Sequence, residues 1–198
     1  KIITDLPAMI SSAIETIHIL LARKMVSRVS LVVTAVVTVI LMRIDADLAG
    51  FGGKGAFYLQ AAFTRSNFTE VLSSWRSGGV DLLGRMIWWN VVNAAAYSVL
   101  FASFIAFLSE ARRSITGETA RLTDQALMLL PFAAAVFDWI SNYLLHMIFS
   151  EGWLREGLVT AYSVLSSVKW AFVMLSLIIV LKSYFSFRKA MKRDMPQG

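Results

Sequence analysis

The 198-residue sequence contains no cysteine, which excludes disulfides, thiolate nucleophiles, cysteine-based zinc sites and cysteine-ligated iron–sulfur clusters. Histidine is scarce too, with two residues, and charged residues make up only 16% of the chain. Within the apolar stretches, a metal ion could draw only on His146 and Asp138, which lie two helical turns apart. We therefore expect no bound metal ion and no cofactor.

Apolar residues are abundant: 57% of the chain is hydrophobic, 12% is aromatic, and the mean hydropathy is +0.64. A helix needs roughly 20 residues to cross a hydrocarbon layer of about 30 Å. Four stretches reach or nearly reach that length, and we predict spans at residues 29–48, 86–109, 125–149 and 160–182. The sequence thus predicts an all-α polytopic membrane protein with a bundle of four transmembrane helices.

Residues 1–28 precede the first span and predict an amphipathic helix on the membrane surface or docked on a partner. Asp5 and Pro7 suit its start, and His18 is interpreted as an interfacial polar residue. The apolar face steps by four and three residues through Leu6, Ile10, Ala13, Ile17 and Leu20 to Lys24. At the other end of the chain, residues 186–198 form a basic tail.

The loop at residues 49–85 predicts a short amphipathic helix on the outer surface. Its apolar positions are Phe68, Val71, Leu72 and Trp75, and Gly78-Gly79 would end it. Ser66 or Asn67 would cap its start. Asn67-Phe68-Thr69 also fits the N-glycosylation pattern, so both interpretations of Asn67 stay open. The preceding Gly50–Gly55 is glycine-rich and predicts a flexible turn.

Basic residues predict the orientation, because cytoplasmic loops carry an excess of lysine and arginine. They gather before the first span, between the second and third, and after the fourth, which predicts that both termini are cytoplasmic. The net charge of +6 then suits anionic lipid headgroups rather than nucleic acid. Five tryptophans fall in the outer half as interfacial anchors: Trp75, Trp88, Trp89, Trp153 and Trp170.

Polar side chains inside the spans carry most of the functional information, because they are costly in hydrocarbon. Arg43 lies near the end of the first span, where it can extend to the interface. The other seven predict a polar cluster in the outer half of the bundle, with one stripe on the second span, one on the third, and a lysine on the fourth: Asn90, Asn93, Tyr97, Asp138, Asn142, His146 and Lys169.

An intramembrane ion pair between Asp138 and Lys169 is the simplest electrostatic arrangement, because an unpaired charge at mid-bilayer costs about 2.5–3.5 kcal/mol. Such a pair could hold the helices together or also contact a ligand or a proton. Pro131 removes a helical hydrogen bond and crowds the carbonyl of Leu127, so we predict a kink below Asp138.

Five motifs lie within about residues 30–185: Phe63-Thr64 with Trp75, the stretch from Trp89-Asn90 to Tyr97, Leu130-Pro131, Phe137–Asn142, and Val168-Lys169. Together they resemble a broad set of bacterial four-helix integral membrane proteins, which implies a bacterial inner membrane. The third span of those proteins commonly reads Asp-x-x-Glu-Asn, where this chain has Asp138-x-x-Ser141-Asn142. Their second span begins with an aspartate, where this chain has Asn90. The resemblance implies the four-helix fold but brings no established activity, and Ser141 in place of the glutamate weakens any transfer of acid–base chemistry.

Three functional classes remain open. The first is a non-enzymatic membrane protein that binds a lipid or other amphiphile at the polar cluster. The second is an accessory or assembly subunit, with other protein subunits or copies of itself as partners. The third, an intramembrane enzyme or transporter subunit, is the least favoured, because the chain has neither an H-E-x-x-H helix nor an internal repeat. No catalytic residue is assigned.

Overall fold

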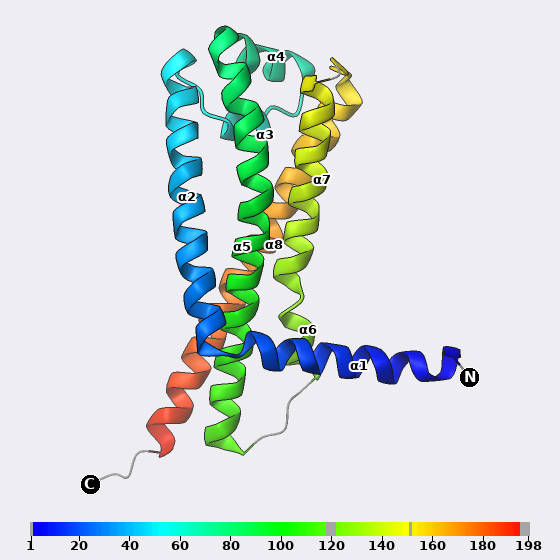
Figure 1. Ribbon diagram of the computed structural model, residues 1–198, viewed down its shortest axis with the longest axis vertical. Coiled ribbons are helices and arrows are strands. Elements are labelled where there is room, and N and C mark those ends of the chain that lie inside the picture. Colours follow the sequence, from blue (N-terminus) through cyan, green and yellow to red (C-terminus); the bar gives the residue numbers. More distant parts are fainter. Residues whose placement is uncertain (1, 118–121, 151, 195–198) are drawn as a thin grey trace.

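The computed structural model describes residues 2–117, 122–150 and 152–194, and within these ranges the ordered elements are all helices (Figure 1). This confirms the all-α fold. The helices are α1 (Ile2–Leu21), α2 (Lys24–Gly52), α3 (Phe57–Gln60), α4 (Arg65–Ser74), α5 (Arg76–Thr116), α6 (Leu122–Leu127), α7 (Leu130–Ser150) and α8 (Glu156–Asp194).

Four segments are long and apolar enough to cross a membrane, which agrees with the four predicted spans and defines a polytopic integral membrane protein. They are Lys24–Gly52, Asp81–Thr116, Gln125–Ser150 and Glu156–Arg193. Each helical segment runs beyond the predicted span at one end or both. At a rise of about 1.5 Å per residue, the 41-residue α5 is roughly 60 Å long, about twice the thickness of a hydrocarbon core.

Helix α5 is the centre of the bundle and contacts α2, α7 and α8, while α7 also packs against α8. Helix α2 lies at one side of the bundle and makes most of its contacts with α5. Both chain termini lie at the same end of the bundle, here called the terminal end (Figure 1). Helices α3 and α4 cover the opposite end, here called the loop end.

The loop end is a packed cap. The indole of Trp75 is 2% exposed and its Nε1 donates to the carbonyl of Lys54 at 2.5 Å, so the prediction of Trp75 as an interfacial anchor is wrong. Asp45 on α2 accepts a hydrogen bond from the Ala56 amide. On the α8 side, Phe63 has a φ of 50°, and its backbone bonds the hydroxyls of Thr160 and Ser163.

Two predictions about the loop helix need correction. Thr64, rather than Ser66 or Asn67, is the N-cap of α4, because its side chain accepts from the Asn67 amide at 3.3 Å. The Asn67 side chain instead donates to the carbonyl of Ala62. Gly78-Gly79 does not end this helix: α4 ends at Ser74, and both glycines lie inside α5. Likewise, the predicted turn at Gly50–Gly55 is helical through Gly52, and Gly53 caps α2 with a φ of 75°.

Helix α1 crosses the bundle at the terminal end (Figure 1). It starts at Ile2, before the predicted start at Asp5 and Pro7. The side chains of Asp5, Leu6 and Pro7 are not among those that the structure describes. His18 is 3% exposed, so it is buried against the bundle rather than interfacial. Ile14 and Leu21 pack beside it in the core. The predicted apolar face stays exposed at Ile10, Ala13, Ile17 and Leu20.

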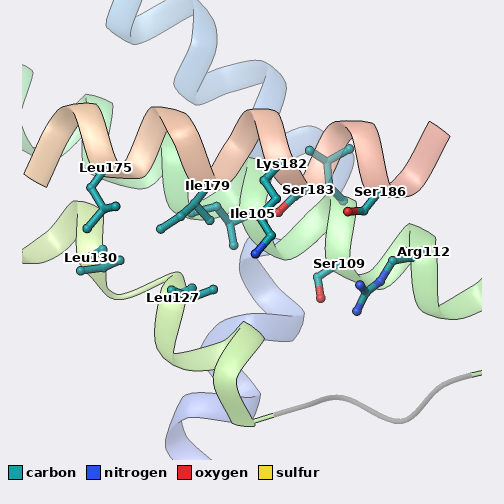
Figure 2. Close-up of a pocket in the computed structure, with 11 residues that line it drawn as sticks. Ile105, Ser109, Arg112, Leu127, Leu130, Leu175, Ile179, Lys182, Ser183 and Ser186 are labelled. Atoms are coloured by element: carbon teal, nitrogen blue, oxygen red, sulfur yellow. The ribbon is translucent and has the colours of Figure 1, made fainter. Parts of the chain in front are cut away.

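The third span is broken at the predicted place. Helix α6 ends at Leu127 and α7 begins at Leu130, so Pro131 occupies the first turn of a new helix, where its missing N–H costs least (Figure 2). Met128, at the break, is fully buried against α5 and α8 residues. The break turns α6 away from the line of α7, and this leaves the terminal ends of α5 and α8 less covered.

Candidate functional site

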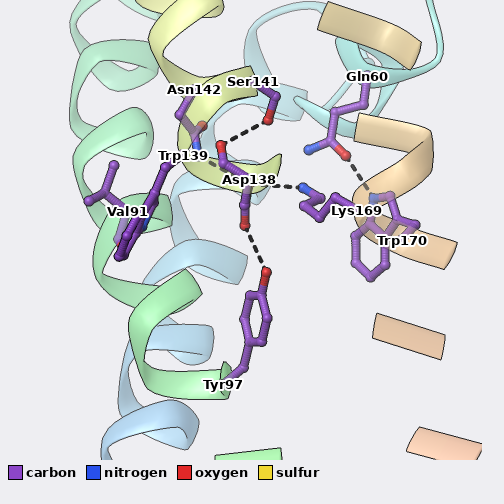
Figure 3. A network of polar contacts seen from close by, with 9 residues as sticks. All are labelled: Gln60, Val91, Tyr97, Asp138, Trp139, Ser141, Asn142, Lys169 and Trp170. Carbon is purple, nitrogen blue, oxygen red and sulfur yellow. Dashed lines mark hydrogen bonds and ion pairs between the residues drawn. The ribbon is translucent and has the colours of Figure 1, made fainter. Parts of the chain in front are cut away.

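A buried polar network joins α5, α7 and α8 near the middle of the bundle (Figure 3). Asp138 on α7 is its centre. Its Oδ1 accepts from Lys169 Nζ on α8 at 3.1 Å and from Asn142 Nδ2 at 3.1 Å. Its Oδ2 accepts from the Tyr97 hydroxyl on α5 at 3.4 Å. The ion pair predicted between Asp138 and Lys169 is therefore confirmed.

The four side chains of this network, here called the Asp138 network, are all buried, with Asp138 4% and Lys169 6% exposed. Small residues allow the helices to approach at this level, since Ala94, Ala134 and Ala135 are buried beside Tyr97. Both oxygens of the Asp138 carboxylate accept hydrogen bonds from neighbouring helical side chains. The network thus connects three helices through one carboxylate, both of whose oxygens accept hydrogen bonds.

Three of the seven predicted residues do not join this network. Asn90 and Asn93 on α5 are half-buried, and within the described part of the chain Asn93 Oδ1 has no hydrogen-bond partner. His146 is exposed and bonds Ser150 one turn along α7. The convergence of all seven side chains, predicted from their spacing, is wrong. Arg43 pairs with Asp47 on the exposed side of α2.

His146 instead lines a groove between α5 and α7, on the loop-end side of the Asp138 network. The groove has a volume of about 430 Å³, within the range of small-molecule sites. This loop-end groove is lined by Gly84, Ile87, Trp88 and Val91 of α5 and by Trp139, Asn142, Tyr143, His146, Phe149 and Ser150 of α7.

The loop-end groove combines apolar aromatic walls with a short polar strip. Trp88 is 75% exposed, and Trp139 donates from Nε1 to the carbonyl of Val91, which fixes its ring across the two helices (Figure 3). Asn142 belongs both to the groove lining and to the Asp138 network. A ligand in the groove would therefore touch a residue that bonds the central carboxylate.

Three residues of the groove, Trp139, Tyr143 and Gly84, were not predicted as site residues from the sequence. The positions of Trp139 and Tyr143 in the sequence carried a usable signal. Each follows a predicted polar residue, Asp138 or Asn142, by one position and so lies about 100° around the helix from it, beside the polar face. Gly84 carries no such signal, because its role in the groove depends on the packing of α5 against α7.

Another interhelical contact adjoins the network. Trp170 donates from Nε1 to Gln60 Oε1 at 2.8 Å and so ties α8 to α3 in the cap. The Lys169 ammonium lies 5.1 Å from the Trp170 ring centroid. The ion pair and the loop-end cap are thus joined through adjacent residues of α8.

Among the described residues, no group of three His, Asp or Glu side chains is placed to hold a metal ion. The fold and these contacts define an all-helical integral membrane protein with a buried ion pair. Comparisons with known protein families, curated proteins and solved structures find no match for this chain.

Proposed function

We propose that this protein is a non-enzymatic membrane protein that binds a lipid or another amphiphile in the loop-end groove beside the Asp138 network. The observation that carries the proposal is the composition of the groove. A polar strip of Asn142, His146 and Ser150 lies next to the exposed rings of Trp88 and Tyr143. An amphiphile needs this combination, because its polar group requires hydrogen-bond partners while its chain requires apolar contact.

Gly84 offers a direct test because a Cβ built at this position has no atom within 4 Å. Gly84→Phe would fill the groove without a first-atom clash, whereas Gly84→Ala adds one methyl group and leaves most of the volume. Native mass spectrometry of the detergent-purified protein, followed by lipid extraction, should find a specific amphiphile on wild type and Gly84→Ala. Gly84→Phe should lose it.

Equal retention by both variants, or no retained amphiphile on wild type, would refute the proposal. His146→Leu provides a second variant of similar volume, because it removes a polar group from an exposed position. It should weaken retention while circular dichroism shows unchanged helix content.

An accessory or assembly subunit is the second candidate, and the closed Asp138 network favours it. The hydrogen bonds to both carboxylate oxygens come from the bundle itself, as expected of a group that only holds helices together. Helix α2 also exposes apolar side chains along its length, including Val29, Val32 and Val36. Retained partner subunits or a second copy, with no specific amphiphile, would favour this function.

We also propose that both termini are cytoplasmic, in a bacterial inner membrane. The support is the gathering of lysine and arginine at the terminal end, together with the resemblance to bacterial membrane proteins. Because the chain has no cysteine, single cysteines introduced at the exposed Ser73 and Ser114 can report on each side. A membrane-impermeant maleimide should label Ser73→Cys in intact spheroplasts and Ser114→Cys only after permeabilisation. The reverse pattern would invert the orientation.

A further inference from the structure

A second groove lies at the terminal end, about 250 Å³ in volume, between α5, α8 and the break that separates α6 from α7 (Figure 2). It is lined by Ile105, Leu108, Ser109, Arg112, Leu127, Leu130, Leu175, Ile179, Lys182, Ser183 and Ser186. None of these residues belongs to the Asp138 network or to the loop-end groove. This terminal-end groove is therefore a separate candidate site.

The break at Pro131 explains why the groove exists. Helix α7 starts at Leu130, while α5 continues to Thr116 and α8 to Asp194, so the last turns of the two long helices extend beyond α7 (Figure 1). The short α6 turns away instead of filling the space between them. An unbroken third span would have covered this part of α5 and α8.

The terminal-end groove is amphiphilic along its length (Figure 2). One end carries the apolar side chains of Leu127, Leu130, Leu175 and Ile179, and the other carries three serines with Lys182 and Arg112. Leu175 is 43% exposed on a helix that is apolar enough to cross a membrane. The apolar end can therefore meet hydrocarbon directly.

The polar end continues into an adjoining hollow of about 470 Å³, which shares Arg112 and Ser186 with the groove. Lys189 and Arg193 of α8 line this hollow. No acidic side chain lines either space. Among the described residues, no ion pair involves Lys182, Lys189 or Arg193. One stretch of α8 thus carries three cationic side chains at the polar end: Lys182 lines the groove beside its three serines, and Lys189 and Arg193 line the adjoining hollow.

We propose that the terminal-end groove binds an anionic phospholipid from the membrane leaflet at the terminal end. The phosphate would lie at the serine hydroxyls beside Lys182, with the charges of Lys189 and Arg193 in the adjoining hollow attracting it, and an acyl chain would lie along the Leu127–Leu130 side. Basic pockets between transmembrane helices recognise such headgroups by charge. The lysine ammonium groups reach the interface while their aliphatic stems lie along the apolar groove. A free phosphate ion would use only the polar end.

Native mass spectrometry in detergent with added dioleoyl phosphatidylglycerol or dioleoyl phosphatidylcholine tests this proposal. The wild type should bind phosphatidylglycerol preferentially. Each lost charge-assisted contact should weaken binding several-fold, so the combined Lys182→Gln, Lys189→Gln and Arg193→Gln variant should bind it on the order of 100-fold more weakly. Ser183→Trp should also weaken binding, because it blocks the groove without changing charge.

The matched control replaces Arg23, Lys24 and Arg28 with glutamine. These exposed residues lie at the same end of the bundle, and their loss lowers the net charge by the same amount. This variant should bind phosphatidylglycerol as wild type does, because a micelle lacks the extended surface that attracts any basic segment. An equal loss in both triple variants would refute a specific groove.

Competition separates the two sources of phosphate. Inorganic phosphate at the concentration of the added lipid should leave phosphatidylglycerol binding unchanged, since it gains nothing from the apolar end. Displacement of the lipid by inorganic phosphate would overturn the lipid assignment. The result is independent of the loop-end groove, because Gly84→Phe should bind phosphatidylglycerol normally.

Discussion

Replacing Lys169 with methionine tests whether the buried ion pair acts as a pair of charges or as an ordinary interhelical hydrogen bond. The substitution keeps an unbranched side chain of similar length and removes the ammonium that lies 3.1 Å from Asp138 Oδ1. Asp138 would retain hydrogen bonds from Asn142 and Tyr97 but would lose its countercharge. Because Asp138 is only 4% exposed, water has little access to replace the lost countercharge.

The two descriptions differ in magnitude. Removing one partner of a buried ion pair costs about 3–5 kcal/mol, because the other charge stays buried without compensation. A hydrogen bond between transmembrane helices averages only about 0.6 kcal/mol and reaches about 1.7. We expect Lys169→Met to cost about 3 kcal/mol of unfolding free energy and Asp138→Asn a similar amount. The double variant, with neither charge, should cost clearly less than their sum, by about 2 kcal/mol or more.

Unfolding by SDS from mixed micelles, followed by tryptophan fluorescence and far-ultraviolet circular dichroism, measures these differences, since the chain has six tryptophans. Lys192→Met is the matched control: it removes an exposed lysine from the same helix and should change stability by less than about 0.5 kcal/mol. If the costs of the two single substitutions sum to the cost of the double variant within about 0.5 kcal/mol, the charge pair is refuted.

The same assay checks two further predictions. An alanine Cβ at Gly52 would lie 2.4 Å from the Ser74 carbonyl oxygen, so Gly52→Ala should destabilise the fold by about 1–3 kcal/mol. Gly50→Ala, with no atom within 4 Å, should be neutral or stabilising by up to about 1 kcal/mol, and equal effects would contradict the packed cap. Tyr97→Phe should cost under about 1 kcal/mol and less than Asn142→Leu, because the tyrosine bond to Asp138 is long at 3.4 Å. The reverse ranking would show that Tyr97 matters more than its geometry indicates.

The sequence predicted the features that depend on composition and local chemistry. Apolar length located the four membrane-spanning segments, and the missing N–H of Pro131 located the break between α6 and α7. The cost of an unpaired intramembrane charge predicted the contact between Asp138 and Lys169. Each of these inferences needs only one helix, or two charges that have no alternative partner inside the spans.

The predictions failed where small rotations between residues add up along a helix, or where the chain folds back on itself. Residues four apart rotate by about 40° relative to each other, so Asp138 and His146 differ by about 80° around α7. One therefore enters the core while the other reaches the loop-end groove. Asn90 and Tyr97 share a face of α5 but differ by about 10 Å in depth, which keeps Asn90 out of the network.

Gly79 and Trp75 show the second kind of failure. Glycine in a sequence commonly predicts the end of a helix. A Cβ at Gly79, however, would lie 2.4 Å from the Trp75 Cβ, so this glycine permits close packing inside a continuing helix. The cap formed by α3 and α4 in turn buries the Trp75 ring. The burial of Trp75 does not follow from periodicity, because it depends on how the loop returns to α2 and α5.

The distribution of polar groups separates stability from binding. Tyr97 and Lys169 use their polar atoms inside the bundle, so their substitution should change unfolding free energy and leave ligand binding intact. His146 is exposed, and its hydrogen bonds to described residues go to its neighbour Ser150, so its substitution should affect binding alone. Asn142 belongs to both sets, since it bonds Asp138 and lines the groove. A bound amphiphile stabilises the folded state more strongly the more tightly it binds at a given concentration. Ligand-dependent stabilisation should therefore persist in Tyr97→Phe, decrease in His146→Leu without a loss of intrinsic stability, and fall together with stability only at Asn142.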